Sequence, residues 1–201
     1  MSNPWDLPPY PLYGDQDQAV LYEWLGRTLE SWERVEFELA CTYSLCVGDP
    51  EWTKVQEYGA GKIFRERIAA LEEVARAFFV RRPNQQHEGQ LRQLILACRG
   101  FADRRNEIAH SMIMDVSGFL FWQDKLLLVA PYGPQFLLVP PYYLLRKHNA
   151  AGLPAFGYSS WELRILQKRL VDLLIQIGDF NDLVWPRELR GSDEGMRPID
   201  T

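Results

Sequence analysis

Four long stretches of the chain carry apolar side chains at a spacing of about 3.6 residues, the period of an α-helix. In the first stretch Leu21, Trp32, Leu39 and Cys46 follow this period and share one face. Such a face has to pack against other elements, because one helix alone cannot remove it from water. The spacing therefore predicts helices over residues 21–46, about 61–80, about 86–112 and about 160–185.

Residues that favour helix ends flank these stretches. Asp15 or Asp17 can cap the start of the first helix, and Pro50 follows its end. The sequence "RRPN" stops the second helix. Ser159 and Glu162 have the spacing of a capping box before the last helix. These signals support the same four helices as the apolar period does.

The period changes between the third and the last helix. "GFLFWQDKLLLVAP" and "QFLLVPP" are short apolar runs separated by turn residues, which is typical of strands. We expect a hairpin around Gln123 and Asp124, within an insertion at about 116–140. The predicted fold is mainly α: an up-and-down helical bundle of four to five helices with a β-hairpin insertion between the third and last long helices.

The length of 201 residues suits one ordinary domain and would cramp two. We expect a Pro- and aromatic-rich arm over residues 1–18, a single helical domain over 19–185 and a polar tail over 186–201. No apolar run approaches the roughly 20 residues that a membrane span needs. The chain also does not start like a secretory signal, so a cytoplasmic location without a membrane partner is expected.

The histidines and cysteines do not predict a metal site. The three cysteines are Cys41, Cys46 and Cys98, and none has C-x-x-C spacing. The three histidines have no metal-ligand spacing on one element. We therefore expect buried thiols, no cofactor and chemistry without a metal. A formal net charge of −5 also means that a nucleic-acid role needs a local basic patch.

The stretch "DRRNEIAHS", residues 103–111, concentrates polar groups on the third helix. At about 100° per residue, Arg105, Asn106 and His110 share one strip with Ala102 and Ala109. The small alanines leave room for a ligand or a facing helix to approach. By the same geometry the side chains of Arg92 and Arg99 lie on the side of His110, which gives a weak basic track suited to RNA.

Glu36 lies near the centre of the apolar face of the first helix. A carboxylate on a buried face needs a partner, and Arg105 is a candidate because short connections favour neighbouring antiparallel helices. The simpler interpretation is therefore structural. Arg105 and Glu36 would form an interhelical ion pair, and Asn106 and His110 would be a polar pair on a solvated edge.

"RNEIAHS" resembles the motif of the higher-eukaryote and prokaryote nucleotide-binding (HEPN) superfamily, in which an Arg, here followed by Asn, precedes a His by five positions. The resemblance covers roughly residues 18–115 and 158–185. It implies an all-helical bundle, with the motif on a late helix. It also implies a homodimer in which two copies of the motif form one cleft, and many such proteins cut RNA without a metal.

On this resemblance the three motif residues would be catalytic. His110 would take the 2′-hydroxyl proton or protonate the leaving oxygen, since imidazole exchanges protons near neutral pH. Arg105 would hold the phosphate through its planar fork, and Asn106 would orient the phosphate or the imidazole. Glu36 would support the site. The expected protein is a bacterial toxin or phage-defence ribonuclease that refuses DNA.

Two alternatives remain at this stage. Some members of the superfamily are non-catalytic modules that bind a partner protein such as a nucleotidyltransferase. The aromatic arm and the cluster of Phe119, Phe121 and Trp122 favour this alternative. The motif would be accidental if the chain belonged to an unrelated helical family.

Overall fold

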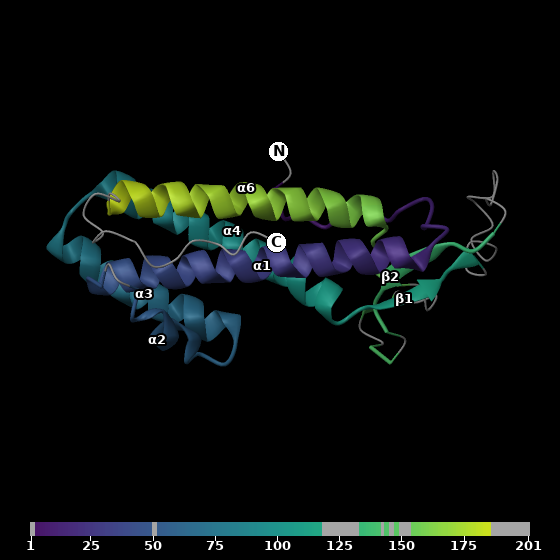
Figure 1. Ribbon diagram of the computed structural model, residues 1–201, viewed down its shortest axis with the longest axis horizontal. Coiled ribbons are helices and arrows are strands. Elements are labelled where there is room, and N and C mark those ends of the chain that lie inside the picture. The colour runs from purple at the N-terminus through teal and green to yellow at the C-terminus, as the bar shows by residue number, and fades with distance from the viewer. Residues whose placement is uncertain are drawn as a thin grey trace, which may run out of the picture. The chain divides into compact units, whose positions relative to one another are not determined.

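The computed structural model describes residues 3–49, 52–117, 133–141, 143–144, 147–148 and 154–185. They form five α-helices and one antiparallel strand pair, which lies between the fourth and the last of these helices in sequence (Figure 1). The predicted fold class, a helical bundle with an inserted strand pair, is confirmed. The elements are α1 (Gln18–Val47), α2 (Val55–Gly59), α3 (Phe64–Arg81), α4 (Gln85–Ala109), β1 (Met112–Asp115), β2 (Phe136–Val139) and α6 (Ser160–Val184).

The chain divides into two compact units, and α1, α4 and α6 each contribute residues to both. The first unit comprises Met1–Trp32 and Arg99–Val171, and the second comprises Glu33–Cys98 and Asp172–Thr201. None of the helices that the structure describes is long and apolar enough to cross a membrane.

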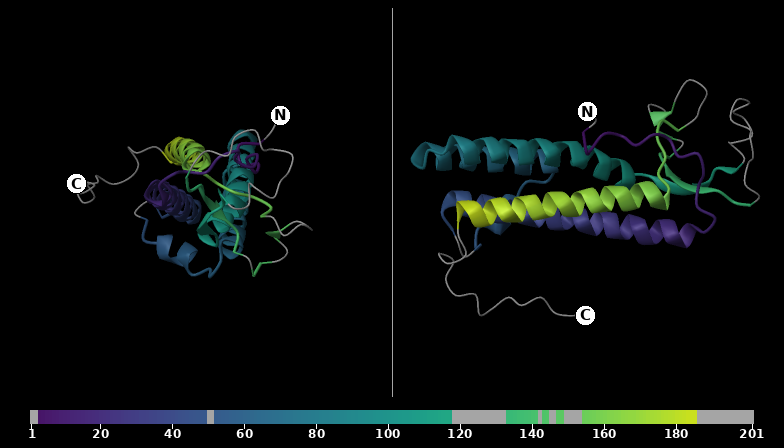
Figure 2. Two further views of the ribbon diagram at one scale, coloured as in Figure 1. Left: turned by 90° about the vertical axis from the view of Figure 1, so that its right-hand side faces the viewer. Right: turned by 90° about the horizontal axis from the view of Figure 1, so that it is seen from above.

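In the first unit the start of α1 runs beside the start of α6 (Figure 2). The Thr28 hydroxyl donates to the carbonyl oxygen of Leu163 at 3.2 Å, and the Gln167 amide donates to the Ser31 hydroxyl at 3.2 Å. Thr28 and Ser31 are buried, and these bonds give their hydroxyl groups hydrogen-bond partners in place of water. The core of this unit includes buried apolar residues from α1, α4 and α6: Leu21, Phe101, Ala102, Ile108, Leu163, Leu166 and Leu170.

β1 and β2 pair in register from Met112 with Val139 to Asp115 with Phe136. The edge of β2 that faces away from β1 also makes backbone hydrogen bonds: Phe136 pairs with Asp15, and Leu138 pairs with Tyr158. The predicted strand in "QFLLVPP" is confirmed. The predicted end of the third helix near Met112 is wrong, because α4 stops at Ala109 and Met112 begins β1. The hairpin predicted around residues 123 and 124 lies outside the described residues.

In the second unit α1 and α6 are joined by a buried polar contact. Thr42 donates its hydroxyl to the Asn181 amide oxygen at 2.8 Å, and the Asn181 amide nitrogen lies 3.0 Å from a carboxylate oxygen of Glu38. Asn181 is 3% exposed, so these bonds replace the water that the amide loses on folding. The surrounding apolar core includes Val35, Leu39, Ile68, Leu71, Leu91 and Ile177.

Side-chain caps fix the starts of α1 and α6. The Asp17 carboxylate accepts the Ala19 amide at 2.8 Å at the start of α1. Asp15, the other predicted cap of α1, instead binds the backbone amide of Ser160 at 2.7 Å at the start of α6. The predicted capping box is confirmed: Glu162 accepts the Ser159 amide at 2.9 Å, and the Ser159 hydroxyl accepts the Trp161 amide at 3.2 Å.

The N-terminal arm, the irregular segment that precedes α1, packs on two glycines. Trp5 lies against Gly100 of α4 and makes an edge contact with Phe101, with ring centroids 6.1 Å apart. The Tyr10 ring approaches Gly157. A Cβ at Gly100 would lie 2.2 Å from the Trp5 ring, so the arm can pack here only because this helical position has no side chain.

We expect Gly100→Ala to lower the free energy of unfolding by about 1–3 kcal/mol, as an overpacked contact does. The matched control is Gly89→Ala on the same helix, where nothing lies within 4 Å of an added Cβ. Alanine at Gly89 should stabilise the helix by up to about 1 kcal/mol. Chemical denaturation measures both values. A stabilised Gly100→Ala variant would show that Trp5 does not occupy this position.

Candidate functional site

Arg105 and Asn106 lie near the carboxyl end of α4, and His110 directly follows its last residue, Ala109. Arg105 is half-buried and its Nη1 lies 3.4 Å from the Asn106 amide oxygen. Asn106 and His110 are exposed, and the His110 backbone amide donates to the Asn106 carbonyl oxygen at 3.3 Å. Phe101 and Ile108 are buried on the same helix and fix its orientation. The structure thus joins Arg105 to Asn106 and leaves the imidazole open to solvent.

This arrangement supplies three kinds of polar group. A guanidinium donates to oxyanions, a carboxamide both donates and accepts, and an imidazole transfers protons. Arg92 and Arg99, the predicted RNA-binding residues, are both exposed on α4. Arg92 also lies 3.4 Å from Glu88, an exposed pair that contributes little to stability. The exposed groups on α4 are therefore accessible to a polyanion.

The guanidinium that binds Glu36 is that of Arg67 on α3. Arg67 Nε lies 2.7 Å from Oε2 and Nη2 lies 2.6 Å from Oε1, so the contact is bidentate. Arg67 also donates to the Gly61 carbonyl oxygen at 3.1 Å. Arg67 was not predicted from the sequence as a partner of Glu36. Glu36 and Arg67 both belong to the second unit. The supporting role of Glu36 at the motif stays a prediction.

Sequence analysis missed a second polar cluster at the end of α4. Arg104 Nη2 lies 2.9 Å from Glu107 Oε1, and the Tyr158 hydroxyl donates to Glu107 Oε2 at 2.6 Å. Tyr158 is fully buried. Burial and the bond to Glu107 raise the pKa of the Tyr158 hydroxyl, while the nearby Arg104 guanidinium lowers it by less. The spacing of Arg104 and Glu107, three residues apart, was the only sequence signal for this cluster.

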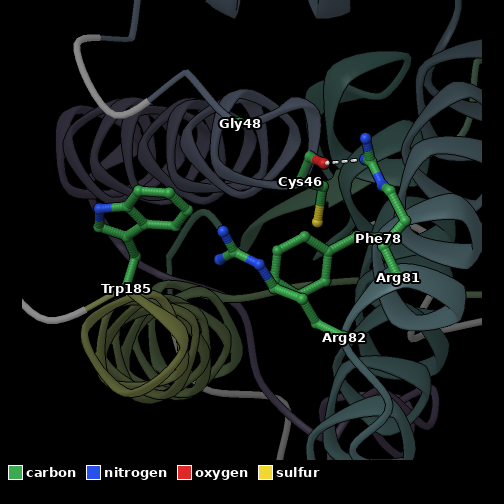
Figure 3. A pocket seen from close by; sticks show the side chains of 6 residues that line it. All are labelled: Cys46, Gly48, Phe78, Arg81, Arg82 and Trp185. Carbon is green, nitrogen blue, oxygen red and sulfur yellow. Dashed lines mark hydrogen bonds between the residues drawn. The ribbon is translucent and has the colours of Figure 1, made fainter.

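The second unit has a pocket of about 170 Å³ at the carboxyl ends of α1 and α3. Figure 3 shows the side chains that line it. The Arg82 guanidinium lies 5.5 Å from the Phe78 ring centroid and 5.0 Å from that of Trp185, and Arg81 donates to the Cys46 carbonyl oxygen at 3.5 Å. Burial raises the pKa of the Cys46 thiol to about 12, so it is not a nucleophile near neutral pH. Cations at helix carboxyl ends are favourable, which accounts for this cluster structurally.

We expect Tyr158→Phe to lower the free energy of unfolding by about 1–3 kcal/mol, because the variant removes the donor of Glu107 Oε2 and leaves only the contact of Oε1 with Arg104. Tyr22→Phe on α1 is the matched control, since Tyr22 is 59% exposed and should shift stability by less than about 0.5 kcal/mol. Urea denaturation of both variants gives the comparison. Equal stability of the two variants would show that the Tyr158 bond contributes nothing.

No family model, curated protein or solved structure matches this chain. Among the described residues no group of histidine, cysteine, aspartate and glutamate side chains is placed to hold a metal ion. The support for a function therefore comes from the contacts and exposure of the side chains at the end of α4.

Proposed function

We propose that this protein is a metal-independent endoribonuclease of the HEPN type, a toxin or phage-defence enzyme of the bacterial cytoplasm, with Arg105, Asn106 and His110 as catalytic residues. One observation carries the proposal. Near the end of α4 the Arg105 guanidinium contacts Asn106, and the exposed His110 directly follows the helix, with its backbone amide bound to the Asn106 carbonyl oxygen. These are the groups that a phosphodiester transfer requires: a proton carrier, a phosphate ligand and an orienting amide.

In the proposed reaction the His110 imidazole takes the proton of an RNA 2′-hydroxyl, and the 2′-oxygen forms a bond to the adjacent phosphorus. The bond from phosphorus to the 5′-oxygen of the next nucleotide breaks, and that oxygen takes up a proton. The products are a 2′,3′-cyclic phosphate and a free 5′-hydroxyl. The Arg105 guanidinium would stabilise the charge that develops on the phosphate oxygens.

The leaving oxygen needs a proton donor as well as the base that starts the reaction. We propose a homodimer in which the ends of two α4 helices meet, so that one imidazole is the base and the second is the acid. Asn106, exposed between Arg105 and His110 in sequence, would orient the phosphate in the shared cleft. Arg92 and Arg99 would contact the RNA backbone and make binding weaker at high salt.

The test is cleavage of a structured RNA in the presence of EDTA. We expect His110→Ala to reduce the cleavage rate by about 10²–10⁴-fold, the usual contribution of a general acid or base. His87→Ala is the matched control, because it removes an imidazole from the other end of the same helix. His87→Ala should cleave like the wild type. Unchanged cleavage in His110→Ala, or loss of wild-type cleavage with EDTA, would reject the proposal.

The second candidate is a non-catalytic HEPN-like module that docks a partner protein such as a nucleotidyltransferase. Exposed apolar side chains on the arm favour it, since Leu12 is 63% and Tyr13 58% exposed. This candidate predicts that the wild type does not turn over RNA and that Arg105→Ala releases a co-purifying partner. RNA cleavage by the wild type that depends on His110 would reject it.

A further inference from the structure

The first unit contains a pocket of about 310 Å³ between the arm, the end of α4 and the start of α6. Arg104, Tyr158 and Arg169 are among the residues of one side, and the arm forms the other with Asn3, Asp6, Leu7, Pro8 and Pro9. This volume lies at the lower end of the range for small-molecule sites. Arg105, Asn106 and His110 do not line this pocket.

Arg104 has hydrogen-bond donors that the described part of the chain does not satisfy. Its Nη2 binds Glu107, whereas Nε and Nη1 are buried and have no hydrogen-bond partner among the described residues. Only 15% of the Arg104 side chain is exposed. Buried donors without acceptors destabilise a fold, and charged donors do so most. Arg104 is part of the pocket lining, so its guanidinium lies at the edge of this space.

The carboxylates in the pocket lining are already bound by donors from their own neighbours. Asp6 accepts the backbone amide of Asn3 at 2.6 Å, and Glu162 accepts that of Ser159 at 2.9 Å. Arg169 is exposed and uses Nη1 to hold the Pro4 carbonyl oxygen at 2.7 Å. The other guanidinium nitrogens of Arg169 are a second source of hydrogen-bond donors at the pocket. Two guanidinium groups favour an oxyanion as the acceptor.

The rest of the lining is apolar and partly open to solvent. Trp161 is 63% exposed and Leu7 is 43% exposed, although both line the pocket. Pro8, Ile165 and Leu166 complete this wall. An indole beside proline and aliphatic side chains offers a flat surface for a ring rather than for a hydrated ion.

We propose that this pocket binds a small molecule with an oxyanion, either a carboxylate or a phosphate monoester, at one end and a planar apolar body at the other. Arg104 and Arg169 bind the oxyanion, and Trp161 and Leu7 contact the body. The proposal does not rest on the proposed ribonuclease activity, because it uses none of the residues assigned to catalysis. The alternative occupant at Arg104 is water. Binding of the probe anions described next distinguishes a ligand site from a site that holds water alone.

The experiment measures binding of benzoate, phenyl phosphate and benzyl alcohol to the full chain by calorimetry. We expect one or both anions to bind with a Kd of about 1 mM, the affinity reasonable for probes with few non-hydrogen atoms. Benzyl alcohol, which keeps the ring and lacks the charge, should bind at least about tenfold more weakly. The ratio of the two anion affinities shows whether the site prefers carboxylate or phosphate.

Variants then assign the binding to this pocket. Arg104→Gln and Arg169→Gln should each weaken anion binding by about tenfold or more. Arg164→Gln is the matched control, since Arg164 is exposed on the same helix as Arg169, contacts the Trp24 ring and does not line the pocket. Arg169→Gln tests the proposal even where Arg104→Gln does not fold, because its side chain is exposed.

Four results would overturn the proposal: no binding of either anion, equal binding of benzyl alcohol, wild-type affinity in Arg169→Gln, or loss of anion binding in His110→Ala. His110→Ala should bind the anions like the wild type. An inactive His110→Ala variant that still binds them therefore separates this pocket from the catalytic proposal. Loss of anion binding in His110→Ala would place the anion at the motif and also contradict the assignment to Arg104.

Discussion

The hydrogen bond from the Tyr158 hydroxyl to Glu107 fixes the end of α4 within the first unit. It is 2.6 Å long, and Tyr158 is fully buried. The Tyr158 backbone also pairs with Leu138 of β2, and the next residue, Ser159, belongs to the capping box of α6. Tyr158 and its neighbour Ser159 therefore connect the end of α4 to a strand and to the start of another helix. The polar groups near the end of α4 are therefore carried by a helix end that is tied down at Glu107.

The last turn of α4 presents different chemistry on its two sides. Asn106 and His110 are exposed, whereas Arg104 is largely buried and lines the pocket beside the arm. Arg105 lies between these environments and is half-buried. A substrate that reached the exposed side would meet an imidazole and a carboxamide. A ligand in the pocket would meet guanidinium donors and an apolar wall, within a turn of the same helix, so both proposals depend on how firmly this turn is fixed.

The four long helices could be predicted from sequence because each buries a continuous apolar face, and this periodic signal does not depend on which element covers it. The short helix α2 was not predicted, because five residues are too few to show the period. The end of α4 could not, because Met112 continues the helical period and only the pairing of β1 with β2 draws it into a strand. Asp15 illustrates the same limit. Its spacing suits a cap of α1, but its carboxylate binds Ser160, far away in the sequence.

The candidate site was predictable only in part, since a motif specifies neighbours on one helix and not partners on others. Sequence placed Arg105, Asn106 and His110 on one strip, and the structure places the last two at the surface. Arg67 and Tyr158 lie on other elements than the carboxylates they bind, so nothing in the local pattern pointed to them. The need for glycine at position 100 could likewise not be predicted, because it follows from the contact with Trp5, far away in the sequence.

The most direct test of the catalytic claim uses an RNA with a single 2′-deoxynucleotide at its main cleavage site. If His110 activates the 2′-hydroxyl, cleavage at that site stops while other sites are still cut, and the unmodified RNA yields ends that carry a 2′,3′-cyclic phosphate. Cleavage that continues at the deoxynucleotide, or products that end in a free 3′-hydroxyl, would contradict the account.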